Sequence, residues 1–158
     1  MANYYISAGQ VSSGIVLSNW DKMYVYSMGT LNRSIVSGNG SVFVSSGGMA
    51  NEINLHRNGA LEVYNGGQVS DTIVYTEGHL RVSSGGMASR TLATGFWTFI
   101  VVEGGVVETT TVKNLASIDI LSGGVANYTD VENNGHFHIY SYDKFPLRFE
   151  ENLNFLRV

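Results

Sequence analysis

Pairs of glycines recur along this 158-residue chain at a fixed interval. Successive pairs begin 19 residues apart, at Gly47, Gly66, Gly85, Gly104 and Gly123. Extending the same interval backwards reaches the pairs Met28-Gly29 and Gly9-Gln10, each of which keeps one glycine. A fixed repeat of about 20 residues is typical of solenoids, in which each repeat stacks on its neighbours. The sequence therefore predicts seven coils over residues 9–141.

Equivalent positions of the coils carry the same kind of side chain. When each coil is numbered from the first residue of its pair, the apolar fifteenth and seventeenth positions are Met23, Val42, Leu61, Leu80, Phe99, Ile118 and Phe137, and Val25, Val44, Val63, Val82, Val101, Ile120 and Ile139. Apolar residues two apart indicate a strand with one buried face. We therefore expect both columns to point inward, and each coil to hold two short strands, at positions six to ten and fourteen to eighteen.

These columns also decide the fold class. β-Branched residues dominate them and no helical period is present. The sequence predicts an all-β protein, a single-stranded right-handed parallel β-helix, with the hand taken from the general rule for parallel crossovers. Open solenoid ends expose unpaired strand edges, so we expect residues 1–8 to form an N-terminal partial coil and residues 142–158 to form a C-terminal cap.

The seventh position carries threonine in four consecutive coils, at Thr72, Thr91, Thr110 and Thr129. We expect these hydroxyls to form a chain of hydrogen bonds along the rod while the methyl groups pack. Rows of threonine that face water are also found in ice-binding surfaces. The residue two positions further on is apolar, however, which favours a column that faces the core.

Composition excludes several classes of protein. The chain has no cysteine, which excludes thiol catalysis and cysteine-ligated zinc. Its 13 acidic residues against nine basic ones argue against a nucleic-acid partner. The longest strongly apolar run, residues 96–102, is far shorter than the roughly 20 residues that span a bilayer. We therefore expect neither nucleic-acid binding nor membrane insertion within this chain.

Three segments resemble a known repeat. Residues 44–51 (VSSGGMAN), 82–89 (VSSGGMAS) and 120–127 (ILSGGVAN) are similar to the AIDA-type repeat, found in the passenger domains of self-associating bacterial autotransporter adhesins. The chain departs from its own pattern at Trp97, which replaces a glycine found at the second corner of other coils. Two further coils depart in the same way, at Asp21 and Ala116.

The resemblance implies a function outside the cell. It implies a secreted protein at the bacterial cell surface that acts in cell adhesion, autoaggregation and biofilm formation, with the secretion signal and the anchor outside this chain. The partner would be a second copy of the protein, bound weakly and multivalently, or a glycan or protein on a host or bacterial surface. The resemblance also suggests O-glycosylation of serines near the corners, which are otherwise ordinary turn formers: Ser45, Ser46, Ser83, Ser84 and Ser122.

The search for catalytic groups finds scattered charges. Polysaccharide-degrading enzymes need two carboxylates close together. Here the outward acids are Glu62 and Asp119, three coils apart, and Glu52 and Asp71, in adjacent coils between arginines. We interpret them as surface charges, and we predict a non-enzymatic protein without a cofactor. A polysaccharide-degrading β-helix and a fibre segment of a phage or surface appendage remain the alternative functions.

Two further surface features bear on binding. His136 and His138 lie on one predicted strand face, but no third ligand is within reach, so we expect no metal site. Outward positions sixteen and eighteen are rich in aromatic and aliphatic residues, namely Tyr24, Tyr26, Phe43, Tyr64, Ile100, Val102, Leu121 and Tyr140. These eight residues form the candidate interaction face. The alternative is an ordinary sheet surface that favours such residues for their β-propensity.

Overall fold

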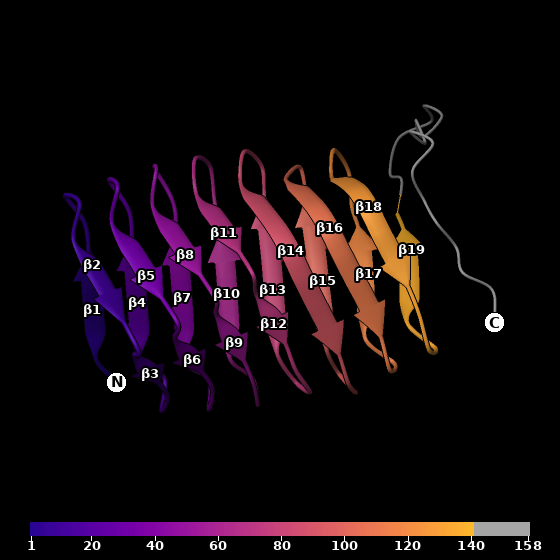
Figure 1. The fold of residues 1–158 in the computed structure, drawn as a ribbon, viewed down its shortest axis with the longest axis horizontal. Coiled ribbons are helices and arrows are strands. Elements are labelled where there is room, and N and C mark those ends of the chain that lie inside the picture. The colour runs from indigo at the N-terminus through magenta and orange to yellow at the C-terminus, as the bar shows by residue number, and fades with distance from the viewer. Residues whose placement is uncertain (141–158) are drawn as a thin grey trace.

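The computed structural model describes residues 1–140, and these residues form a rod of stacked coils (Figure 1). They contain 19 strands and no helix. Strands of successive coils pair in parallel, commonly 19 residues apart, as Leu61 does with Leu80. The predicted all-β parallel solenoid of about seven turns is confirmed. The predicted cap at 142–158 lies outside the described residues.

The strands form two sheets that face each other across the core (Figure 1). Sheet A has eight strands, β1 (Asn3–Ile6), β4 (Lys22–Val25), β7 (Ser41–Val44), β10 (Ala60–Val63), β13 (His79–Ser83), β15 (Phe99–Glu103), β17 (Ser117–Ile120) and β19 (His136–Ile139). Sheet B has eleven strands, β2 (Val11–Ser13), β3 (Val16–Leu17), β5 (Thr30–Asn32), β6 (Ile35–Val36), β8 (Met49–Asn51), β9 (Asn54–Leu55), β11 (Gln68–Ser70), β12 (Ile73–Val74), β14 (Met87–Thr94), β16 (Val106–Lys113) and β18 (Val125–Val131).

In each coil the chain enters sheet B before position six. The predicted bounds of the first strand, positions six to ten, are therefore wrong. In the first four coils it consists of two short pieces, and the residue at position six between them has a positive φ, as at Glu52 (56°) and Asp71 (54°). L-residues rarely adopt this conformation. The kink turns the side chain at position six outward and allows position seven to enter the core. Arg90 keeps a positive φ (51°) although β14 continues through it.

The glycine pairs are explained by the corner between the two sheets. Gly47 has φ +82°, a conformation that glycine adopts without steric cost. A Cβ atom on Gly48 would lie only 2.3 Å from the carbonyl oxygen of Val25 in the preceding coil. One glycine is therefore needed for the turn and the next for the close approach of two coils.

The fifth coil is out of register with the sequence frame. His79 pairs with Phe99, 20 residues on, and Phe99 pairs with Ser117, 18 residues on. One extra residue before β15 thus shifts the strand, and one residue fewer after it restores the frame. The prediction that Phe99 and Val101 point inward is therefore wrong.

The same shift corrects part of the candidate interaction face. Ile100 and Val102 are 0% exposed and belong to the core, so their predicted outward position is wrong. Thr98 occupies the place that glycine has at the second corner of other coils, because its carbonyl accepts from the backbone N–H of Ser117 as the carbonyl of Gly59 accepts from His79. Trp97 consequently lies one place earlier than the frame assigns it, exposed in the corner.

The four threonines at position seven do face the core, at 0–2% exposure. Their predicted hydrogen-bond chain is wrong, because the Oγ1 atoms of Thr72, Thr91, Thr110 and Thr129 have no hydrogen-bond partner among the described residues. Ser34, two coils before Thr72 in the same column, differs. Its Oγ accepts from the backbone N–H of Ile15 at 3.2 Å and donates to the carbonyl of Asn32 at 2.9 Å.

We expect the double substitution Thr91→Val and Thr110→Val to raise the free energy of unfolding. A buried hydroxyl without a partner costs roughly 1–3 kcal/mol, and valine keeps nearly the same shape. A gain of about 1 kcal/mol per site should appear as a higher midpoint in urea denaturation. Ser34→Ala is the control and should lower stability, because its hydroxyl is bonded. A loss of stability in the valine variant would show that the threonine hydroxyls are paired.

Candidate interaction surface

The outer face of sheet A carries a row of aromatic rings near the N-terminal end of the rod. Tyr5, Tyr24 and Phe43 occupy the same column on β1, β4 and β7. Their ring centroids are 5.2 and 5.0 Å apart and the planes differ by 14° and 15°. Each such contact contributes roughly 0.5–1.5 kcal/mol beyond its buried area. We call these three residues the aromatic row.

Other members of the candidate interaction face lie beside the row or far from it. Tyr26 follows β4 and is half-buried, and Tyr64 follows β10 and is 38% exposed. Leu121 and Tyr140 lie in the last two described coils. The eight predicted residues therefore do not form one patch. Four of them lie in or beside the aromatic row, two lie at the other end of the described rod, and Ile100 and Val102 are buried.

Tyr64 is held by its neighbour on the same strand face. Its hydroxyl donates a hydrogen bond to the carboxylate of Glu62. This bond, together with partial burial and the negative charge of Glu62, raises the pKa of Tyr64 to about 12. The phenol thus remains neutral, and Glu62 acts as its acceptor.

On the outer face of sheet A, sequence reasoning missed the aromatic residues Tyr5 and Phe99. Tyr5 is 60% exposed and extends the aromatic row. It lies 19 residues before Tyr24, so the repeat frame extended into residues 1–8 identifies it. Phe99 also faces outward, but no sequence signal reveals it, because the strand residues 99–102 are apolar on both faces.

Sheet B displays the residues at position six as a charged column. Arg33, Glu52, Asp71 and Arg90 are exposed in successive coils. The guanidinium of Arg90 donates two hydrogen bonds of 2.7 Å to the carboxylate of Asp71. These bonds lower the pKa of Asp71 and raise that of Arg90. A general acid needs a raised pKa, so the geometry gives Asp71 the role of an ion-pair partner.

A shallow hollow of about 330 Å³ crosses this column. It is lined by Arg33, Glu52 and Asp71 of the column and by Ile35, Asn54 and Ile73 beside them. The other two acids considered above lie on sheet A. Asp119 is 2.8 Å from Nδ1 of His138, and Glu62 accepts from Tyr64. The structure thus does not bring these carboxylates together in one site.

His136 and His138 lie on β19 with ring centroids 6.0 Å apart. Among residues 1–140, no group of three or more histidine, cysteine or acidic side chains is placed to hold a metal ion. The serines proposed for glycosylation line the corners between sheets A and B. Ser46, Ser84 and Ser122 are exposed there, whereas Ser45 and Ser83 are half-buried.

Comparison with known proteins supports the adhesin-type repeat. The sequence matches no protein-family model and no curated protein sequence. A solved structure, that of a TibC-catalysed hyper-glycosylated TibA fragment, matches with a TM-score of 0.83 and 29% sequence identity over 85% of this chain. This chain covers 49% of the length of that fragment.

The TibA fragment is an AIDA-type autotransporter adhesin passenger, so the predicted resemblance to the AIDA-type repeat is confirmed. The match supports an adhesin-type repeat in this chain. It is a match to an adhesin fragment and not to an enzyme. In the described part of the chain, no helix is long and apolar enough to cross a membrane.

Proposed function

We propose that this chain is a repeat module of a bacterial cell-surface adhesin that acts in cell adhesion or self-association, including aggregation and biofilm formation. The observation that carries the proposal is the match to the TibA passenger fragment over 85% of the chain. The partner is a second copy of the protein or a glycan or protein on another cell. Such a module is secreted and displayed at the cell surface.

The geometry of the rod supports contacts that are weak and repeated. Each coil presents only a few outward side chains, and single exposed contacts contribute little free energy. Many such contacts along the rod, or many rods on one surface, add through effective concentration. The aromatic row and its neighbours Tyr26 and Tyr64 are outward aromatic residues of sheet A that offer apolar area for such contacts.

The O-glycosylation of corner serines belongs to the same proposal. The matching TibA fragment is hyper-glycosylated by its printed description. Ser46, Ser84 and Ser122 are exposed at corresponding corners of their coils, where a sugar meets no core residue. Attached sugars would line one edge of the rod and leave the outer face of sheet A free.

We expect the free 158-residue chain to be a monomer or weak dimer at micromolar concentration and yet to clump beads that carry it densely. Sedimentation equilibrium measures the first and light scattering of coated beads the second. Clumping should rise steeply with the density of the chain on the bead. A stable trimer in solution would favour the alternative function, a fibre segment. Densely coated beads that do not clump with one another would contradict self-association.

A further inference from the structure

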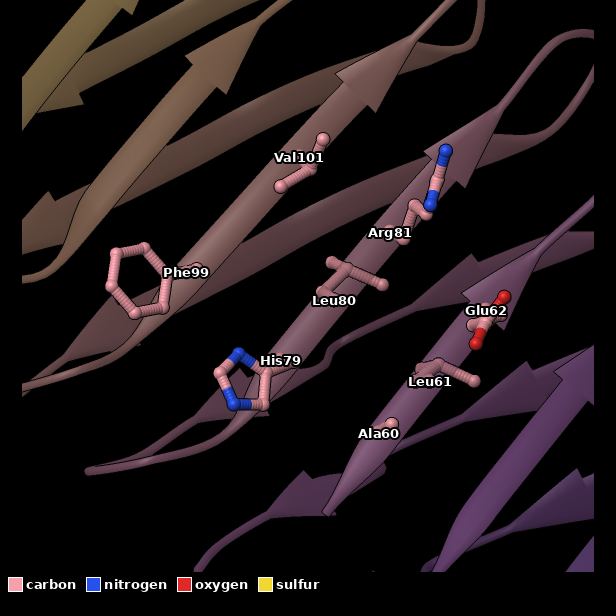
Figure 2. A pocket seen from close by; sticks show the side chains of 8 residues that line it. All are labelled: Ala60, Leu61, Glu62, His79, Leu80, Arg81, Phe99 and Val101. Atoms are coloured by element: carbon pink, nitrogen blue, oxygen red, sulfur yellow. The ribbon is translucent and has the colours of Figure 1, made fainter. Parts of the chain in front are cut away.

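Two rings form a flat platform in the middle of sheet A. His79 on β13 and Phe99 on β15 lie in paired positions, with ring planes 3° apart and centroids 5.7 Å apart. Figure 2 shows both rings face-on. Their neighbours along the strands, Leu80 and Ile100, are buried, so the two half-buried rings lie on the outer face. This platform exists only because of the register shift in the fifth coil, which turns Phe99 outward.

A hollow of about 200 Å³ adjoins the platform across β10, β13 and β15. Ala60, paired with His79, leaves the space open because its side chain is small. Glu62 and Arg81 line the same hollow, two residues further along their strands (Figure 2). The aromatic surface and the charged groups therefore lie side by side on one face.

The polar groups of the hollow are held in place and still have bonding capacity. Arg81 forms an ion pair with Glu103, and Glu62 accepts a hydrogen bond from Tyr64. A carboxylate can accept about four hydrogen bonds and a guanidinium can donate five, so both groups can bond a ligand as well. Neither side chain has to reorganise to do so, which favours binding.

Burial lowers the pKa of His79, although the charge of Glu77 opposes this effect. The imidazole is therefore neutral near pH 7. A neutral ring next to Phe99 extends the apolar platform, and its nitrogen atoms provide one donor and one acceptor at the edge.

We propose that this hollow is a subsite for one pyranose ring of a saccharide, with a C–H face of the sugar on Phe99 and His79 and its hydroxyls bonded to Glu62 and Arg81. A pyranose is apolar on its faces and carries hydroxyls around its edge, which matches a flat aromatic surface beside a fixed acceptor and a fixed donor. We call these four residues the platform site.

The charges of the platform site disfavour a nucleotide, the other common ligand of flat aromatic surfaces. Glu62 and Glu103 lie beside the only cation of the hollow, Arg81, and the whole chain has a net charge of −4. A phosphate group would be repelled, whereas a neutral sugar is not. The hollow is also small and open, so we expect a dissociation constant on the order of 10 mM for a single sugar.

The platform site deepens the proposed function, on which it rests, by naming a saccharide as the ligand of an adhesive rod. We expect methyl β-D-glucopyranoside or methyl β-D-galactopyranoside to shift the ring resonances of Phe99 and His79 in NMR spectra of the 158-residue chain. Saturation transfer should reach the C–H protons of the sugar. Mannitol, which has hydroxyls but no ring face, should do neither.

Variants locate the binding. Phe99→Ala should weaken binding of the pyranoside at least about tenfold, while Phe99→Tyr keeps it. Tyr75→Ala is the matched control, since it also removes an aromatic ring stacked on a histidine, His56, but lies after β12 of sheet B and away from the hollow, and it should leave binding unchanged. A thermal melt checks that each variant is folded. Failure of both pyranosides to bind, equal effects of mannitol, binding of adenosine in their place, or unchanged binding by Phe99→Ala would each overturn the proposal.

The failure of this proposal is distinguishable from the failure of the proposed function. Bead clumping that persists in Phe99→Ala while the pyranoside no longer binds shows that self-association does not use the platform site. Pyranoside binding by a chain that never clumps beads supports the platform site and contradicts self-association.

Discussion

Val63→Asp is expected to abolish cooperative folding of the rod. Val63 is fully buried in β10, between Val44 and Val82 of the neighbouring coils. An aspartate there loses the packing of valine and places a carboxylate without a partner in the core, which costs several kcal/mol. This loss is comparable with the whole stability of a typical domain. Circular dichroism should show no cooperative thermal transition.

Arg81→Ala is the control for this prediction. Arg81 lies on the adjacent strand β13 but is exposed, and its ion pair with Glu103 joins two solvated side chains. We expect its melting curve to stay close to that of the unchanged chain, with a difference of less than about 1 kcal/mol. A normal melt for Val63→Asp would mean that the inward columns are misassigned.

The fifth coil allows the same test one residue at a time. Val102→Asp should abolish folding as Val63→Asp does, because Val102 is 0% exposed. Val101→Asp should be tolerated, since Val101 points outward beside it on β15. Equal effects of the two substitutions would contradict the register shift, and with it the platform site.

The inward columns could be read from the sequence because each coil repeats the choice of its neighbours. Val63 is apolar in a column that is apolar in all seven coils, and stacking identical coils makes that column the core. The glycine corner was predicted for the same reason. Repetition thus supplies the information that a single coil lacks.

The repeat frame fails where one coil differs from its neighbours. Residues 99–102 are apolar throughout, so alternation does not show which face is buried, and a slip by one residue exchanges the faces. The extra residue in the second corner, next to Trp97, shifts the register of β15 by one. The sequence does not show this shift, because one residue fewer after β15 restores the total length of the repeat. The predicted start of the sheet B strand at position six is wrong for another reason. Glu52 and Asp71 adopt a positive φ there, which their residue types do not suggest.

The candidate interaction face contains residues that the repeat frame placed correctly and residues that it placed wrongly. Tyr24, Tyr26, Phe43 and Tyr64 lie at outward positions of regular coils, where the frame holds. Ile100 and Val102 were misplaced by the slip, and Phe99 was missed by it. The position of a side chain follows from the repeat, but the contact that it makes with another molecule depends on chemistry that the repeat does not contain.

Replacing Tyr24, Tyr26, Phe43 and Tyr64 together with serine is expected to abolish clumping. Together with Tyr5, these four residues supply the aromatic area on the N-terminal half of sheet A, and serine offers little area for contact between rods. The fold should persist, because none of the four belongs to the core, although the loss of ring stacking lowers stability by a few kcal/mol at most. A cooperative melt below the original temperature should confirm this.

A matched variant separates the aromatic surface from apolar surface in general. Four exposed apolar residues of sheet B occupy one column and can be changed to serine together: Val11, Met49, Met87 and Val125. This variant loses a similar number of exposed apolar side chains from the opposite face. Beads that carry it should clump as the unchanged chain does.

Light scattering of densely coated beads tests the adhesive role of this rod most directly. The account predicts that beads with the unchanged chain and with the sheet B variant clump, and that beads with the four-serine variant of sheet A stay dispersed at the same coating density. Clumping that persists in the four-serine variant, or that disappears equally in both variants, would contradict it.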